Sequence, residues 1–190
     1  MSAEEIVLLD EAGNFIGTAP KITSHHTHTP YHLAFSCYLI DDQGRVLITQ
    51  RAHAKRTFPS VLTNSACGHP APGESLRDAV ARRLDMELGM SASDFTLVLP
   101  DFSYRAVAAD GTVEWERCPV VRAVATGDPK PNPDEVEATA WRTWAECLEL
   151  ADRPESSPWY RMQIVQLAPL GRPADWPAQP VEALPPALVW

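Results

Sequence analysis

A short segment in the first half of the chain, SACGHP, places a thiol and an imidazole two residues apart. Cys67 and His69 point to the same side if this segment is extended, because side chains alternate along a strand. A cysteine in such a place can bind a metal, attack an electrophile, carry a proton or fill a small buried space. The segment alone leaves these four roles open.

Other parts of the chain offer further ligands for a metal ion. Four histidines lie within eight residues, namely His25, His26, His28 and His32. Glu114 and Glu116 are two apart in a strand-like segment and therefore share one face. Imidazole nitrogens mixed with carboxylates suit a borderline divalent ion such as Mn²⁺ or Zn²⁺. Together with His69 these residues predict a metal site, and spacing leaves open which histidine of the crowded group binds.

Gly68 also begins a loop-and-helix pattern that can present an acid to a hard cation. Four apolar residues recur every four positions, namely Leu76, Val80, Leu84 and Leu88. They predict a helix over 74–89 that ends at Gly89. Glu87 on this helix, with carbonyls of the preceding loop, suits Mg²⁺. The simplest alternative is an ordinary surface ion pair between Glu87 and Arg83, one turn apart.

This stretch resembles the Nudix box, which runs Gly-x5-Glu-x7-Arg-Glu-hydrophobic-x-Glu-Glu-x-Gly-hydrophobic. In Nudix hydrolases the glutamates of the box hold metals and activate water. Here two acidic positions are occupied by Arg83 and Met86, and Glu87 is what remains of the later pair. Water attack on a diphosphate is therefore poorly supported, and a Nudix pyrophosphohydrolase is the first alternative function.

The remaining segments indicate a mixed α/β fold. Strands are predicted at 4–10 and 15–20, 34–41 and 45–51, 96–107 and 112–125, and 137–144, with a turn joining each of the first three pairs. Helices are predicted at 145–151 and 158–167. After Leu167 the chain holds six of its 18 prolines, so the tail is either disordered or draped over the domain.

Composition limits the class of protein. The 190 residues suit one well-cored domain, and 45% hydrophobic with 22% charged residues is typical of a soluble globular protein. No apolar run approaches the roughly 18 residues of a membrane span, and the acidic start MSAEEIVLLD is unlike a signal peptide. The formal charge of −9 argues against nucleic-acid binding. A small anion can still bind where the few cations gather, as in RAHAKR over 51–56.

Seven stretches together resemble the type I isopentenyl-diphosphate isomerase family. They are HLAFS (32–36), RAHAKRTFP (51–59), TNSACGHP (63–70), the broken box ending ELG (87–89), PDFSYRA (100–106), VEWERCPV (113–120) and SPWYRMQ (157–163). They stand in the family's order and cover roughly residues 3–165. TNSACGHP followed by a broken Nudix box is the most specific of these features.

The resemblance implies four groups of site residues. The family's metal site corresponds to His25, His32, His69, Glu114 and Glu116. Its proton-transfer residues correspond to Cys67 and Glu116, its neighbouring tyrosine to Tyr104, and the tryptophan that covers the hydrocarbon to Trp159. Its diphosphate-binding cations correspond to Lys21, Arg51, Lys55 and Arg83. Glu87 corresponds to the acid that holds a second, substrate-bridging Mg²⁺.

The implied reaction converts isopentenyl diphosphate to dimethylallyl diphosphate through a tertiary carbocation, in isoprenoid biosynthesis. We expect Glu116, or Tyr104 hydrogen-bonded to it, to deliver the proton and Cys67 to complete the shift as a thiolate. The ion in the His/Glu site is expected to be Mn²⁺, Zn²⁺ or Mg²⁺. No flavin is expected, because the chain lacks a dinucleotide-type glycine-rich turn and the chemistry uses only protons. The second alternative function is a non-catalytic metal-binding module.

The predicted architecture is α/β, a Nudix-like mixed β-sheet sandwiched between helices in a single domain. The isomerase domain is predicted over 1–166, and the proline-rich tail over 167–190 is predicted to be extended or disordered. The expected partner is a small prenyl diphosphate, with no nucleic acid and no membrane span. The chain is expected to be a monomer in the cytoplasm.

Overall fold

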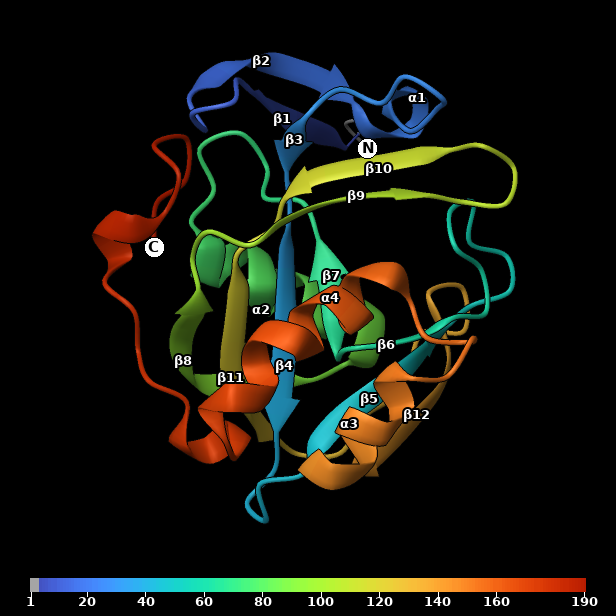
Figure 1. Ribbon diagram of the computed structural model, residues 1–190, viewed down its shortest axis with the longest axis vertical. Coiled ribbons are helices and arrows are strands. Elements are labelled where there is room, and N and C mark those ends of the chain that lie inside the picture. The colour runs from blue at the N-terminus through green and yellow to red at the C-terminus, as the bar shows by residue number, and fades with distance from the viewer. Residues whose placement is uncertain (1–3) are drawn as a thin grey trace.

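Two β-sheets form the framework of the chain, and the computed structural model describes residues 4–190 (Figure 1). The five-stranded sheet has the order β2-β1-β3-β10-β9, with β1 Glu5–Leu9, β2 Phe15–Pro20, β3 His32–Leu33, β9 Ser103–Val107 and β10 Val113–Arg117. The seven-stranded sheet has the order β12-β5-β4-β11-β8, with β6 beside β5 and β7 beside β4. Its bounds are β4 Phe35–Ile40, β5 Val46–Arg51, β6 Leu62–Thr63, β7 Ala66–Gly68, β8 Ser91–Leu99, β11 Val120–Thr126 and β12 Val136–Arg142. Within residues 4–190 each sheet contains one parallel pair, β10 with β3 and β11 with β4, so the predicted mixed sheet is confirmed.

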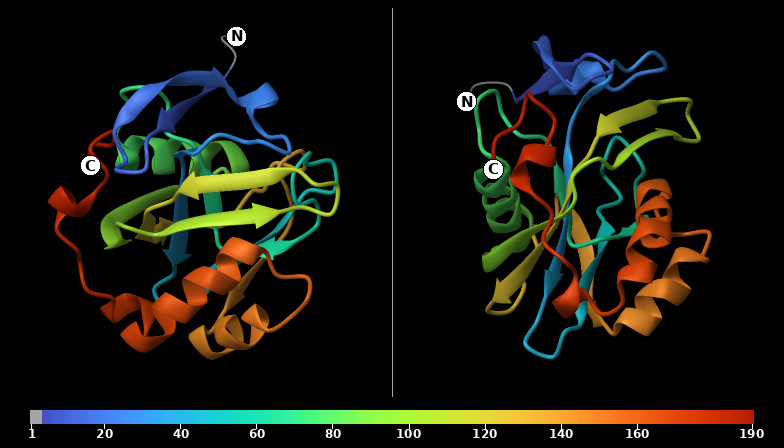
Figure 2. Two further views of the ribbon diagram at one scale, coloured as in Figure 1. Left: turned by 45° about the horizontal axis from the view of Figure 1, so that its top comes forward. Right: turned by 60° about the vertical axis from the view of Figure 1, so that its left-hand side comes forward.

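Helices cover both faces of the seven-stranded sheet (Figure 2). Their bounds are α1 Lys21–Ser24, α2 Leu76–Leu88, α3 Trp144–Ala151 and α4 Pro158–Leu167. Along β4, Phe35, Cys37 and Leu39 pack on the α2 side, whereas Tyr38 and Ile40 pack on the side of α3 and α4. This alternation produces two apolar cores from one strand. Among the described residues, no helix is long and apolar enough to cross a membrane.

The helix predicted over 74–89 is observed as α2, and its four-residue apolar stripe is fully buried. The Ser75 hydroxyl caps the helix by accepting from the Asp78 N–H at 3.1 Å. Gly89 ends it in the left-handed conformation, with φ of 58°. Arg83 and Glu87 on this helix are also buried, so the alternative of an ordinary surface pair is wrong.

The predicted hairpins differ in how far their strands pair. β1 and β2 pair along their length, as expected for 4–10 and 15–20. β4 and β5 pair at Ile40 and Val46, and beyond that point β7 pairs with β4 and β6 with β5. The segment that carries Cys67 is thereby inserted into the sheet as β7.

Two predicted strands are each divided between the two sheets. The segment 96–107 supplies the end of β8 and then β9, and 112–125 supplies β10 and then β11. Pro100 and Pro119 lie at the breaks, and proline has no N–H to donate to a ladder. The glutamates of β10 therefore stand on a different sheet from Cys67.

The proline-rich tail lies over the domain and reaches the β1–β2 turn (Figure 1). It contains three short 3₁₀ helices, Ala168–Leu170, Pro173–Asp175 and Val181–Ala183. Trp176, Leu184 and Leu188 are buried in the two cores, and the Val189 carbonyl accepts from the Leu76 N–H at 2.8 Å. Of the two alternatives for this segment, the structure has the draped one.

Candidate active site

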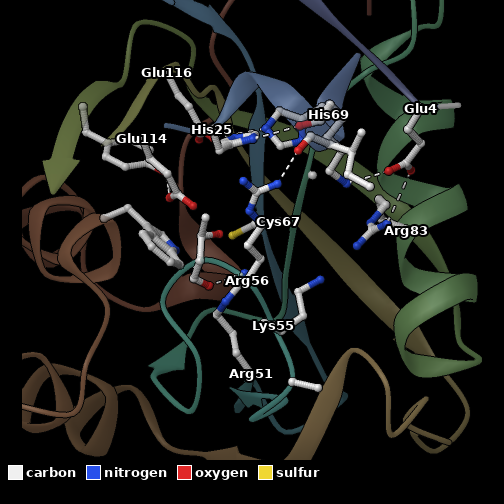
Figure 3. A pocket seen from close by; sticks show the side chains of 17 residues that line it. Glu4, His25, Arg51, Lys55, Arg56, Cys67, His69, Arg83, Glu114 and Glu116 are labelled. Carbon is white, nitrogen blue, oxygen red and sulfur yellow. Dashed lines mark hydrogen bonds and ion pairs between the residues drawn. The ribbon is translucent and has the colours of Figure 1, made fainter. Parts of the chain in front are cut away.

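A cavity of about 560 Å³ lies between the two sheets (Figure 3). Eleven of the thirteen predicted site residues line it, namely Lys21, His25, Arg51, Lys55, Cys67, His69, Arg83, Tyr104, Glu114, Glu116 and Trp159. His32 and Glu87 lie outside the lining. Cys67 comes from the seven-stranded sheet and Glu116 from the five-stranded sheet, so these two side chains reach the cavity from different walls.

Strand register and two loop ends assemble a cluster of imidazoles with one carboxylate. β3 and β10 pair His32 with Glu116, while His25 ends α1 and His69 follows β7. One ligand atom from each of these four residues lies within 4.8 Å of all the others. The Nε2 atom of His69 is 3.2 Å from both His32 Nε2 and Glu116 Oε1. This buried His/Glu cluster could bind a metal ion.

The donor atoms of the cluster fit a divalent cation. Pro30 O can only accept, so the His32 Nδ1–H donates to it at 2.8 Å and the Nε2 lone pair of neutral His32 faces the cluster. The Nδ1 of His25 meets the Lys21 carbonyl at 3.3 Å in the same way. His69 Nδ1 is buried without a hydrogen-bond partner among the described residues. Converging lone pairs of this kind are stabilised by a cation between them.

Three residues considered as ligands lie outside this cluster. The Glu114 carboxylate accepts a hydrogen bond from the Tyr104 hydroxyl at 3.0 Å, and four of the five expected ligands lie in the cluster. Tyr104 therefore donates to Glu114 and not to Glu116, although β9 and β10 place it opposite Glu116. His26 Nδ1 accepts from the His28 N–H on the surface, which leaves the clustered position to His25.

Burial and close contacts set the protonation of the two predicted proton carriers. Burial raises the pKa of Cys67 to about 11, against the opposing effect of hydrogen bonds to Ser36 and Asn64. Burial also raises the pKa of Glu116, but its contacts with the His32 and His69 imidazoles outweigh burial and hold that pKa well below its usual range. Both shifts favour a protonated thiol facing an ionised carboxylate.

Buried polar side chains hold the Cys67 thiol in place. Its Sγ–H donates to Asn64 Oδ1 at 3.3 Å, and Sγ lies 3.4 Å from Ser36 Oγ. Ser36 accepts from Gln163 Nε2 at 2.8 Å, and Gln163 Oε1 accepts from the Tyr38 hydroxyl at 2.9 Å. These hydrogen bonds link helix α4, which carries Gln163, to strand β4, which carries Ser36 and Tyr38, behind the thiol.

Trp159 forms an aromatic wall of the cavity. Its Nε1–H donates to Thr63 Oγ1 at 2.8 Å, which fixes the indole. The Phe58 ring packs edge-on at 5.3 Å, and the Tyr104 ring lies 5.9 Å away. The Arg51 guanidinium lies 5.8 Å from the indole centroid and donates to the Phe58 carbonyl at 3.2 Å. An indole held in this way can face a cationic group in the cavity.

The far end of the cavity is lined by cations that are already paired with carboxylates. Lys21 Nζ lies 2.6 Å from Glu4 Oε2. Lys55 Nζ forms an ion pair with Glu135 Oε2, on the segment before β12. Burial and the nearby Arg83 charge lower the pKa of Lys21, and the contact with Glu4 opposes this shift.

Arg83 joins this network from helix α2. Its Nη2 pairs with Glu87 and lies 3.4 Å from Glu135 Oε2, the same oxygen that Lys55 contacts. Glu87 is thus held by Arg83 and does not face the cavity directly. A role for Glu87 toward Mg²⁺ requires that carboxylate to be shared with Arg83 or released by it.

Four residues of the site were not singled out from the sequence. Asn64 stood in TNSACGHP and Arg56 in RAHAKR, so their segments were noticed but their side chains were not. Glu4 is the first residue of the strand predicted over 4–10, and extending the hairpin register would have placed it opposite Lys21. Glu135 gave no signal in the sequence, because its partners lie 52 and 80 residues away.

Comparison with known families and folds defines the class of protein. Residues 30–163 match the family described as NUDIX domain. The crystal structure of a Deinococcus radiodurans protein matches 86% of this chain and 98% of its own, with a TM-score of 0.66 and 19% identity. That likeness concerns the fold, and it agrees with the predicted Nudix-like architecture.

Curated relatives define the family more narrowly. The isopentenyl-diphosphate Delta-isomerase of Saccharopolyspora erythraea is 50% identical over 189 residues, which cover 98% of this chain and 97% of the relative. The isopentenyl-diphosphate Delta-isomerase of Mycolicibacterium vanbaalenii is 54% identical over 171 residues, with 90% and 94% covered. The chain belongs to the isopentenyl-diphosphate Delta-isomerase family, as its motifs indicated.

Proposed function

We propose that the protein converts isopentenyl diphosphate to dimethylallyl diphosphate by adding one proton to the alkene and removing another. The observation that carries this proposal is the entry of Cys67 and Glu116 into one cavity from two different sheets. A substrate held between them meets a proton carrier on each side. Relatives 50% and 54% identical are named for this reaction.

The chemistry explains the composition of the cavity. Protonation of the terminal methylene forms a tertiary carbocation, and loss of a proton from the carbon nearer the diphosphate gives the allylic isomer. One of Cys67 and Glu116 delivers the proton and the other removes it. Because water would capture the cation, the filled cavity must be dry. The face of Trp159 stabilises the cation by about 2 kcal/mol or more when desolvated.

The two ends of the cavity have separate tasks in this proposal. His25, His32, His69 and Glu116 would hold Mn²⁺, Zn²⁺ or Mg²⁺, which supplies positive charge that orients the Glu116 carboxylate. Lys21, Arg51, Lys55 and Arg83 bind the diphosphate. Glu87 would hold a Mg²⁺ that bridges to the phosphate oxygens, since Mg²⁺ usually binds through one or two carboxylates plus phosphate.

Product analysis tests the proposal directly. Incubation with isopentenyl diphosphate and Mg²⁺, without flavin, is expected to form dimethylallyl diphosphate and to release no phosphate. Absence of dimethylallyl diphosphate above an enzyme-free control contradicts the proposal. Phosphate release would favour the hydrolase alternative instead, and bound metal without turnover would favour a metal-binding module.

A further inference from the structure

Glu4 places a carboxylate inside the cation-lined end of the cavity (Figure 3). Its Oε2 is 2.6 Å from Lys21 Nζ, and its Oε1 is 3.7 Å from Arg83 Nη1. Arg82 Nη1 is a third cation close to the same oxygen, at 3.8 Å. Three positive side chains from α1 and α2 therefore converge on one carboxylate, which stands where an anionic ligand would be attracted.

The register of the first hairpin positions Glu4. β1 and β2 pair Glu5 with Pro20, so the next two residues that face each other are Glu4 and Lys21. The Lys21 N–H donates to the Glu4 carbonyl at 2.8 Å, and side chains at opposed positions of an antiparallel pair are neighbours. The backbone of Glu4 is thus anchored. Its side chain is 49% exposed, so it has room to turn toward solvent while the backbone hydrogen bond to Lys21 is kept.

Three cations at this end are paired with carboxylates of the protein itself. The cations are Lys21, Lys55 and Arg83, and the carboxylates in contact with them are Glu4, Glu87 and Glu135. Of these acids, Glu4 is the one in the cavity lining and the most exposed. Arg83 also keeps a buried Nε–H without a partner among the described residues. A diphosphate entering this end would meet Glu4 before the other two acids.

We propose that Glu4 is an internal counter-ion that occupies part of the diphosphate subsite and is displaced when the ligand binds. The assignment of that subsite rests on the proposed function. Because the ligand must break the contacts of Glu4 before forming its own, the Glu4 charge weakens diphosphate binding. The pair with Lys21 is partly exposed, so the effect is about two- to five-fold in affinity, or about 0.4–1 kcal/mol.

The substitution Glu4→Gln removes the charge and keeps the size of the side chain. Calorimetric titration with inorganic pyrophosphate in the presence of Mg²⁺ measures the subsite without turnover. We expect Glu4→Gln to bind pyrophosphate about two- to five-fold more tightly, with KM for isopentenyl diphosphate lowered by a similar factor. Glu5→Gln is the matched control, because Glu5 is exposed and contacts Thr18 outside the cavity. Its pyrophosphate affinity should equal that of the unsubstituted protein.

Two results would overturn this proposal. Weaker pyrophosphate binding by Glu4→Gln would show that Glu4 assists the ligand, by holding Mg²⁺ or by orienting Lys21. Equal binding by Glu4→Gln and Glu5→Gln would show that no displacement occurs. The test is independent of catalysis, so a protein that shows the expected pyrophosphate affinities but forms no dimethylallyl diphosphate would refute the proposed function and leave the role of Glu4 intact.

Discussion

The two ends of the cavity have opposite electrostatic designs. At the imidazole end, electron-pair donors of His32, His69 and Glu116 approach within 3.2–3.4 Å. In the described part of the chain, the ion-pair partners of Glu116 are these two histidines and no lysine or arginine. At the other end Lys21, Lys55 and Arg83 already contact acids of the protein. The imidazole end is therefore suited to bind a cation. At the cation end, a diphosphate must replace the Glu4 carboxylate.

The largest expected effect separates proton transfer from metal binding at the imidazole end. Cys67→Ala removes a thiol that lies outside the imidazole cluster, so turnover should fall by about 10²–10⁴-fold while metal content stays near normal. Glu116→Gln removes a proton carrier and a ligand together, so activity and metal content should fall together. Elemental analysis beside turnover measures both.

The two substitutions should not add, because both residues serve one proton shift. If Cys67→Ala loses its metal, the thiol is a metal ligand, and its assignment to proton transfer alone is wrong.

The next largest effect concerns stability at the cation end. Arg83→Met leaves the Glu87 and Glu135 carboxylates without their shared partner, and unpairing a buried ion pair costs about 3–5 kcal/mol. Arg82→Met is the matched control on the same helix, since its pair with Glu74 is partly exposed and should be worth about 1 kcal/mol. Urea unfolding of both variants decides the matter. Equal losses would mean that burial of Arg83 carries no electrostatic consequence.

Metal removal should have a smaller effect on stability and should act only through the imidazole end. At a metal concentration about 100-fold above the dissociation constant, binding stabilises the folded state by about 2.7 kcal/mol. For a chain of this length that corresponds to a melting temperature about 5–10 °C higher than in chelator. His32→Ala should abolish the difference, and the exposed His26→Ala should preserve it. If His32→Ala keeps the full difference in melting temperature between metal and chelator, the ion binds outside the imidazole cluster.

The smallest expected effect concerns Trp159, the aromatic side chain that is proposed to stabilise the carbocation. Trp159→Phe keeps an aromatic face but loses the larger indole and its hydrogen bond to Thr63. A loss of about 1 kcal/mol of cation–π stabilisation lowers kcat about five-fold. Metal content should stay unchanged, because Trp159 lies outside the imidazole cluster. Pyrophosphate affinity should also stay unchanged, because the phenyl ring keeps an aromatic face toward Arg51, whose guanidinium lies 5.8 Å from the indole centroid. A change in pyrophosphate affinity would indicate that Trp159 acts by supporting Arg51.

Local patterns in the sequence determined one helix and two hairpins, because these elements depend on residues that are close together in the chain. The apolar repeat and Gly89 predicted α2 within two residues at its start, and the turn signals predicted the β1–β2 and β9–β10 hairpins. The motif order also predicted eleven residues of one cavity. These features follow from side-chain periodicity, turn chemistry and resemblance, which are all readable along the chain.

Tertiary structure alone decided which of these residues touch one another. His25 joins the cluster because it ends α1 beside β3, whereas His26 lies on the surface. Glu114 contacts Tyr104 rather than the imidazoles, and Glu135 joins the cations from a distant segment. Burial and ion pairing between segments tens of residues apart depend on the packing of the two sheets, and no local pattern in the sequence encodes that packing.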